Sequence, residues 1–96
     1  MSNNDLKMAA NAEYQKFALE MRHIYTELSA LLDYEAKQEL EEAQNAWSVF
    51  AEKHARFLAG LMRGGTGESL LYLEAMNSLM HARISALREA LSERSV

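Results

Sequence analysis

One strong break interrupts this chain, and it limits what the chain can fold into. Proline is absent, and three of the four glycines lie together at Gly64, Gly65 and Gly67. Proline and glycine are the residues that most often end a helix, and no other segment carries so strong a signal for a turn. No segment shows the period-two alternation of a strand. We therefore expect long helices on both sides of the glycine cluster.

The spacing of apolar residues predicts three helices, at about residues 4–32, 34–63 and 67–93. Apolar side chains recur every three or four residues in each segment, which places them along one face. These are Tyr14, Phe17, Met21, Ile24, Leu28 and Leu31 in the first segment; Ala36, Leu40, Ala43, Trp47, Phe50, Phe57 and Leu61 in the second; and Leu73, Met76, Met80, Ile84, Leu87 and Leu91 in the third. Asp33 and Thr66 are expected to cap the second and third helices.

The short connections predict how the helices are arranged. Turns of a few residues make consecutive helices antiparallel neighbours, so residues 1–96 are predicted to form one all-α domain, an up-down-up bundle of three helices. Beside its main apolar stripe, the second helix carries another, made of Ala51, Ala55, Leu58 and Met62. One neighbouring helix cannot cover so wide an apolar face. We therefore expect the second helix to lie at the centre of the bundle.

Composition and charge exclude several classes of protein. Without cysteine, neither disulfides nor zinc-cysteine sites can form. The net charge is −4, and the basic residues are scattered, which argues against nucleic acid as a partner. The longest uncharged stretch, residues 43–51, is too short to span a membrane. The first residues lack the pattern of a signal peptide, so the chain as given is expected to be cytoplasmic, or periplasmic if an export signal was removed.

The histidines are the first candidates for chemistry. Glu20 and His23 have the Glu-x-x-His spacing of di-iron bundles, but only one copy is present, which favours an exposed polar face. His54 interrupts the main stripe of the second helix and is interpreted as a neutral core histidine, hydrogen-bonded to a neighbouring helix. His81 is a lone residue on a polar face.

No catalytic machinery can be assembled from the remaining residues. The serines lie outside any nucleophile motif, and residues 64–67 lack the lysine of a phosphate-binding loop. The sequence therefore predicts a protein that is not an enzyme, with no catalytic, metal-binding or cofactor-binding residues.

Two groups of charges carry information about packing and partners. Arg83 continues an apolar line in the third helix, so we expect it to be partly buried and paired with a carboxylate or helix-end carbonyls, in preference to recognising a partner. The acidic run Glu39, Glu41 and Glu42 is interpreted as a solvated face that a cationic partner would find attractive.

A pattern of motif residues spans about two-thirds of the chain, from Met21 to Leu87. It consists of a tyrosine in the first helix, Ala-Gln, a tryptophan three residues on, an aromatic, a Gly-Gly turn, and a leucine four residues before an arginine. These are Tyr25, Gln44, Trp47, Phe50, Gly64, Gly65, Leu79 and Arg83, with Thr66 after the glycines. In these positions the chain resembles the LprI-type lysozyme inhibitors, which have serine in place of Thr66.

The resemblance implies a small protein-binding domain that inhibits a lysozyme or a related basic protein. Family members are usually exported and carry cysteines on both sides of the Gly-Gly turn, at the positions of Ala55 and Ala75. Loops on rigid scaffolds often bind partners, so the predicted binding loop consists of Arg63, Gly64, Gly65, Thr66, Gly67, Glu68 and Ser69. The alternatives are a cytoplasmic adaptor, chaperone or toxin-neutralising protein on the same fold, and a homodimer that pairs wide apolar faces.

Overall fold

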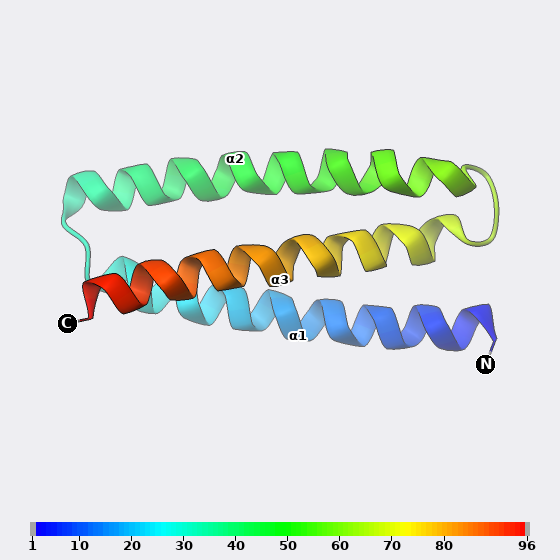
Figure 1. Ribbon diagram of the computed structural model, residues 1–96, viewed down its shortest axis with the longest axis horizontal. Helices are drawn as coiled ribbons and strands as arrows, with labels where there is room; N and C mark the ends of the chain where they lie inside the picture. Colours follow the sequence, from blue (N-terminus) through cyan, green and yellow to red (C-terminus); the bar gives the residue numbers. More distant parts are fainter. Residues whose placement is uncertain (1, 96) are drawn as a thin grey trace.

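The computed structural model describes residues 2–95, which form three long helices joined by short turns (Figure 1). Helix α1 spans Asn3–Ala30, α2 spans Tyr34–Ala59 and continues into the short 3₁₀ helix η1 at Gly60–Met62, and α3 spans Glu68–Arg94. The described residues contain no strand, and no helix among them is long and apolar enough to cross a membrane. The predicted all-α, up-down-up fold is confirmed, with bounds that agree to within a few residues.

The helix ends confirm one predicted cap and correct another. The Asp33 carboxylate accepts a hydrogen bond from the backbone N–H of Ala36 at 2.9 Å, which caps α2 as expected. Thr66 does not cap α3, because the helix begins one residue later, after Gly67, which has no side chain to offer. Two turns precede the helix, closed by hydrogen bonds from the Gly65 N–H to the Met62 carbonyl and from the Glu68 N–H to the Gly65 carbonyl. Instead, the Thr66 carbonyl accepts a hydrogen bond from the Asn3 side chain at 2.9 Å.

The three helices lie in a flat layer, with α3 between α1 and α2 (Figure 1). The molecule measures 47 × 23 × 14 Å. The expectation that the second helix is central was wrong. Helix α3 buries apolar side chains against both neighbours, whereas α2 packs mainly on one side and leaves much of its wide apolar face uncovered.

Two packed clusters hold the layer together. The larger joins α1 and α3, and Leu40 and Trp47 of α2 cover its edge; its buried members are Met21, Ile24, Leu28, Met80, Ile84 and Leu87. The second cluster joins α2 to α3, where the fully buried Ala51 and Ala55 meet Ala75 and Met76. Alanines let two helices approach closely, but they bury little apolar area. The contact between α2 and α3 is therefore close but contributes less stabilisation than the contact between α1 and α3.

The second half of the main apolar stripe predicted for α2 lies outside the core. We call Phe50, His54, Phe57 and Leu61 the α2 ridge; its three apolar members are 53%, 73% and 86% exposed. His54 was expected to be a hydrogen-bonded core residue, and this was wrong. It is half-buried and stacks on the Phe50 ring at a centroid distance of 5.2 Å, with the Phe57 ring at 6.1 Å. Ala51 and Ala55, from the other apolar stripe of α2, pack against α3 instead of the ridge.

Candidate protein-binding site

Residues 63–67 of the predicted binding loop form the turn between η1 and α3, and Glu68 and Ser69 are the first residues of α3. The loop lies at the same end of the molecule as the start of α1 (Figure 1). Gly64 has φ +78°, a backbone conformation that residues with a side chain rarely adopt. Gly65 donates its backbone N–H to the Met62 carbonyl at 2.8 Å, and a Cβ there would lie 3.2 Å from that oxygen. Gly64 thus supplies the positive φ of the turn, and Gly65 allows the close approach to the Met62 carbonyl.

Contacts on both sides brace this loop. The Asn3 side chain ties the Thr66 carbonyl to the start of α1. The Arg63 guanidinium folds back over η1, so closely that a Cβ added at Gly60 would lie 2.9 Å from it. Residues 63–66 are all exposed. The loop therefore presents a small, glycine-rich tip in a defined conformation.

An open groove adjoins the loop, between the end of α2 and the start of α3. It is lined by Arg56, Ala59, Glu68, Ser69, Tyr72 and Leu73. Glu68 and Ser69 belong to both the loop and the groove, which makes the two one continuous surface. Sequence reasoning had not assigned Arg56 and Tyr72 to the site, because they come from different helices and neither belongs to a motif.

The groove contains polar groups that can form hydrogen bonds with a partner. Burial raises the pKa of Tyr72, and the Glu52 carboxylate raises it further. A tyrosine hydroxyl is protonated at neutral pH even without this shift, so Tyr72 can donate a hydrogen bond. Arg56 pairs with Glu52 at 2.7 Å along the exposed side of α2. A partner in the groove would meet a guanidinium, a phenol and a carboxylate around an apolar floor.

The motif residues outside the loop lie mostly between the helices. The Arg83 Nε donates to the Gln44 Oε1 at 2.9 Å, and the Gln44 Nε2 lies 3.2 Å from the Met21 sulfur. These contacts connect α3, α2 and α1 in turn. Trp47 contacts both packed clusters, and Leu79 packs against the second one.

The partner of Arg83 differs from the expected one. A carboxylate or helix-end carbonyl was predicted, but the acceptor is the neutral amide of Gln44. A neutral amide costs less to desolvate beside the core than a carboxylate does. Burial lowers the pKa of Arg83, although an arginine remains charged at neutral pH. The remaining motif aromatics are more accessible: Tyr25 is half-buried, and Phe50 belongs to the exposed α2 ridge.

Replacing Arg83 with methionine is expected to lower the free energy of unfolding by about 1 kcal/mol, because the Gln44 carbonyl loses its donor. A double-mutant cycle with Gln44→Leu should give a coupling energy of about 0.5–1.5 kcal/mol, measured by urea denaturation. Unchanged stability combined with lost partner binding would instead make Arg83 a recognition residue.

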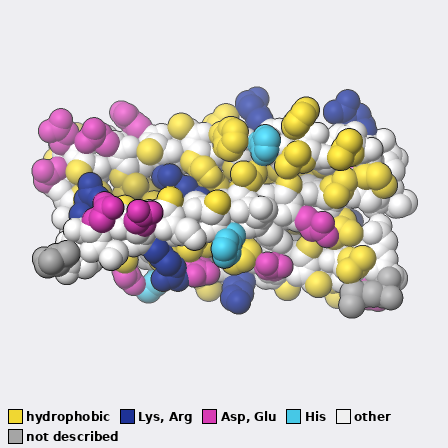
Figure 2. Space-filling view, in the orientation of Figure 1, with side chains coloured by type: hydrophobic (Ala, Val, Ile, Leu, Met, Phe, Trp, Pro, Cys, Tyr) yellow, Lys and Arg dark blue, Asp and Glu magenta, His cyan; other side chains and the backbone are white. Residues whose placement is uncertain are grey.

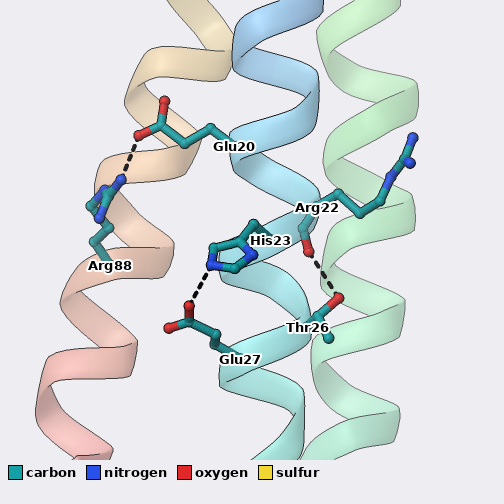
Figure 3. A network of polar contacts seen from close by, with 6 residues as sticks. All are labelled: Glu20, Arg22, His23, Thr26, Glu27 and Arg88. Atoms are coloured by element: carbon teal, nitrogen blue, oxygen red, sulfur yellow. Dashed lines mark hydrogen bonds and ion pairs between the residues drawn. The ribbon is translucent and has the colours of Figure 1, made fainter.

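Figure 3 shows the polar contacts in the second half of α1, around Glu20 and His23. His23 pairs with Glu27 at 2.7 Å on the exposed side of the helix, whereas Glu20 reaches across to Arg88 of α3. Glu20 and His23 thus engage different partners, as on a polar face. Among the described residues, no group of three His, Cys, Asp or Glu side chains could hold a metal ion. His81 is exposed and meets the Phe17 ring edge-on at 5.8 Å.

The geometry of the turn and of the Gln44–Arg83 contact gives the sequence motif a structural basis. Over residues 1–87, the chain matches the family model described as lysozyme inhibitor LprI. The chain belongs to the LprI family. The match begins before Met21, where the motif residues first suggested a resemblance, and it includes the start of α1 that braces the hairpin loop. No curated protein and no solved structure matches the chain.

The acidic face of this LprI protein lies far from the hairpin loop. Figure 2 shows several carboxylates gathered at the end of the molecule opposite the loop, over the first half of α2. Glu42 and Arg63 are separated by about 30 Å along α2 and η1, at 1.5 Å per residue. The predicted binding loop and the acidic run therefore lie at opposite ends of the molecule. The structure makes them two separate surfaces.

Proposed function

We propose that this LprI-family protein inhibits a lysozyme by placing its hairpin loop and the adjoining groove over the cleft of the enzyme. Lysozymes cleave a glycosidic bond between two carboxyl groups that line such a cleft. The observation that carries the proposal is the exposed, glycine-rich loop at one end of the molecule, which a hydrogen bond holds to the start of α1. A rigid loop loses little conformational entropy on binding.

The groups around the tip supply the chemistry that such a cleft would recognise. The Arg63 guanidinium can pair with a catalytic carboxylate, and a charge-assisted contact of this kind is stronger than a neutral hydrogen bond. Thr66 and Tyr72 offer hydroxyl groups that can form hydrogen bonds with the polar groups of a sugar-binding cleft. Bound in this way, the loop would block the substrate from entering.

The overall charge favours the encounter between the two proteins. Net charge −4 attracts a basic lysozyme over long range, which raises the association rate more than the final affinity. The acidic face near Glu42 is distant from the loop, so its contribution is long-range. Salt should therefore slow association.

Replacing Arg63 with alanine is expected to weaken lysozyme inhibition at least about tenfold, since a charged pair in a cleft is lost. The measurement is the clearing of a cell-wall suspension by each of several lysozymes with micromolar inhibitor. Lys16→Ala, which removes an exposed charge from α1, is the matched control and should leave inhibition unchanged. Circular dichroism confirms that both variants are folded.

Two results would refute the proposal. If the unaltered protein inhibits none of the lysozymes tested, the inhibitory function is wrong. If it inhibits and the Arg63→Ala and Tyr72→Phe variants inhibit equally well, the loop and groove are not the contact surface.

A second candidate is a cytoplasmic adaptor, chaperone or toxin-neutralising protein on the same fold. Alanines at positions 55 and 75, where family members usually carry cysteines, support it, because both are buried in a close contact between α2 and α3 that needs no bridge. It predicts one stoichiometric partner in the cytosol of the source cell. Purification at the native expression level with no partner recovered would count against it.

A further inference from the structure

The α2 ridge is an apolar surface that the rest of the chain leaves uncovered. Phe50, Phe57 and Leu61 are more than half exposed, and Figure 2 shows hydrophobic side chains gathered over the second half of α2. Their spacing of seven and four residues, with His54 between the two phenylalanines, keeps them on one side of the helix. A contiguous exposed patch that includes two aromatic rings is typical of an interaction surface.

The packing of α2 explains why the ridge lies outside. Its inward face is made of small side chains, Ala51, Ala55 and Ala59, which are buried against α3. The large apolar side chains therefore face away from α3. Covering them would remove more apolar surface from water than the alanines do.

We propose that a second copy of this chain covers the ridge, with the two α2 helices antiparallel about a two-fold axis near Phe50. In this register Phe57 of one copy lies over Ala43 of the second copy, and His54 lies over Ala46. Both alanines are exposed, so they leave room for the rings. The large side chains in the second half of one α2 helix thus lie over the small side chains in the first half of the second copy's α2.

The charges along α2 favour this antiparallel arrangement. Residues 34–46 contain four glutamates and one lysine, a net charge of −3, whereas residues 47–63 contain two arginines and one lysine against one glutamate, a net charge of +2. Antiparallel pairing places each acidic half beside a basic half. A parallel pair would place like charges together, which is unfavourable.

The proposed pairing leaves the hairpin loops apart. Each loop begins about 20 Å along the helix from the axis, on opposite sides, so the two loops lie roughly 40 Å apart. Self-association is therefore a property separate from lysozyme inhibition, and either can fail without the other.

Sedimentation equilibrium at tens to hundreds of micromolar tests the pairing. We expect a species of twice the 10.9 kDa chain mass. Phe57→Glu should raise the dissociation constant at least about a hundredfold, because it puts one charge from each copy into the apolar contact. Leu19→Glu, at a residue of α1 that is 65% exposed, is the matched control and should stay dimeric. A monomer at all concentrations, or a Phe57→Glu variant that dimerises as well as the control, would overturn the proposal.

The absence of cysteine allows a sharper test of the register. A single cysteine from Phe50→Cys should form a disulfide-linked dimer under mild oxidation, because it lies near its own copy at the axis. Leu61→Cys, which shortens the ridge similarly, should not, since the two copies of residue 61 lie about 33 Å apart. Cross-linking at both positions would indicate a parallel pair and overturn the antiparallel arrangement.

Discussion

Truncating Leu28 to alanine is expected to lower the free energy of unfolding by about 3 kcal/mol, one of the two largest effects on stability that we expect. Leu28 is only 2% exposed and lies in the cluster that joins α1 to α3. The change removes buried apolar atoms and leaves a cavity, and the two losses add. Small domains are stable by about 5–15 kcal/mol in total, so the loss is a large part of the whole.

Urea denaturation followed by fluorescence measures this change, because Trp47, the single tryptophan, contacts both packed clusters. Leu19→Ala is the matched control: the same helix and the same truncation, but at an exposed position, where the effect should stay within about 0.5 kcal/mol. Equal losses at the two positions would contradict the packing described for α1.

Introducing cysteines at both Ala55 and Ala75 is expected to allow a disulfide that stabilises the protein by about 3 kcal/mol. The two alanines are buried in one cluster on facing helices, and the bridge would close a loop of about 20 residues, which restricts the unfolded chain. For a domain of this size the gain corresponds to a rise in Tm of roughly 12–24 °C.

Thermal unfolding with and without a reducing agent isolates the contribution of the bridge, because the reduced double variant carries the same two substitutions. Each single-cysteine variant controls for the loss of one alanine. Mass spectrometry reports whether the bridge has closed within one chain. Failure to close under oxidising conditions would show that the register of α2 against α3 is wrong.

The sequence was sufficient for the number, length and direction of the helices, because these depend on local signals. The glycine cluster and Asp33 mark the turns, and apolar spacing marks the helices between them. Which helix lies in the middle of the layer depends on which of the two apolar stripes of α2 packs against α3. The width of the apolar face does not determine which stripe packs there. The stripe with Ala51 and Ala55 does so because these small side chains let the two helix backbones approach.

The part of the candidate site that is formed by consecutive residues could be predicted from the sequence. Gly64 and Gly65 locate the loop, since the turn needs a positive φ and a close approach to a carbonyl. The groove beside it combines Arg56 and Tyr72 from separate helices, and only the fold brings them together. The Gln44–Arg83 contact likewise joins different helices. The sequence indicated only that Arg83 lies among apolar residues on one face of the third helix.

The hydrogen bond between Asn3 and the Thr66 carbonyl has a practical consequence for anyone attaching this protein to a surface or a label. It fixes the beginning of α1 beside the hairpin loop, whereas α3 ends at the opposite end of the layer (Figure 1). A fluorophore or affinity tag fused before α1 would crowd the loop and lower the measured affinity. Attachment after α3 would leave the loop free for a binding sensor.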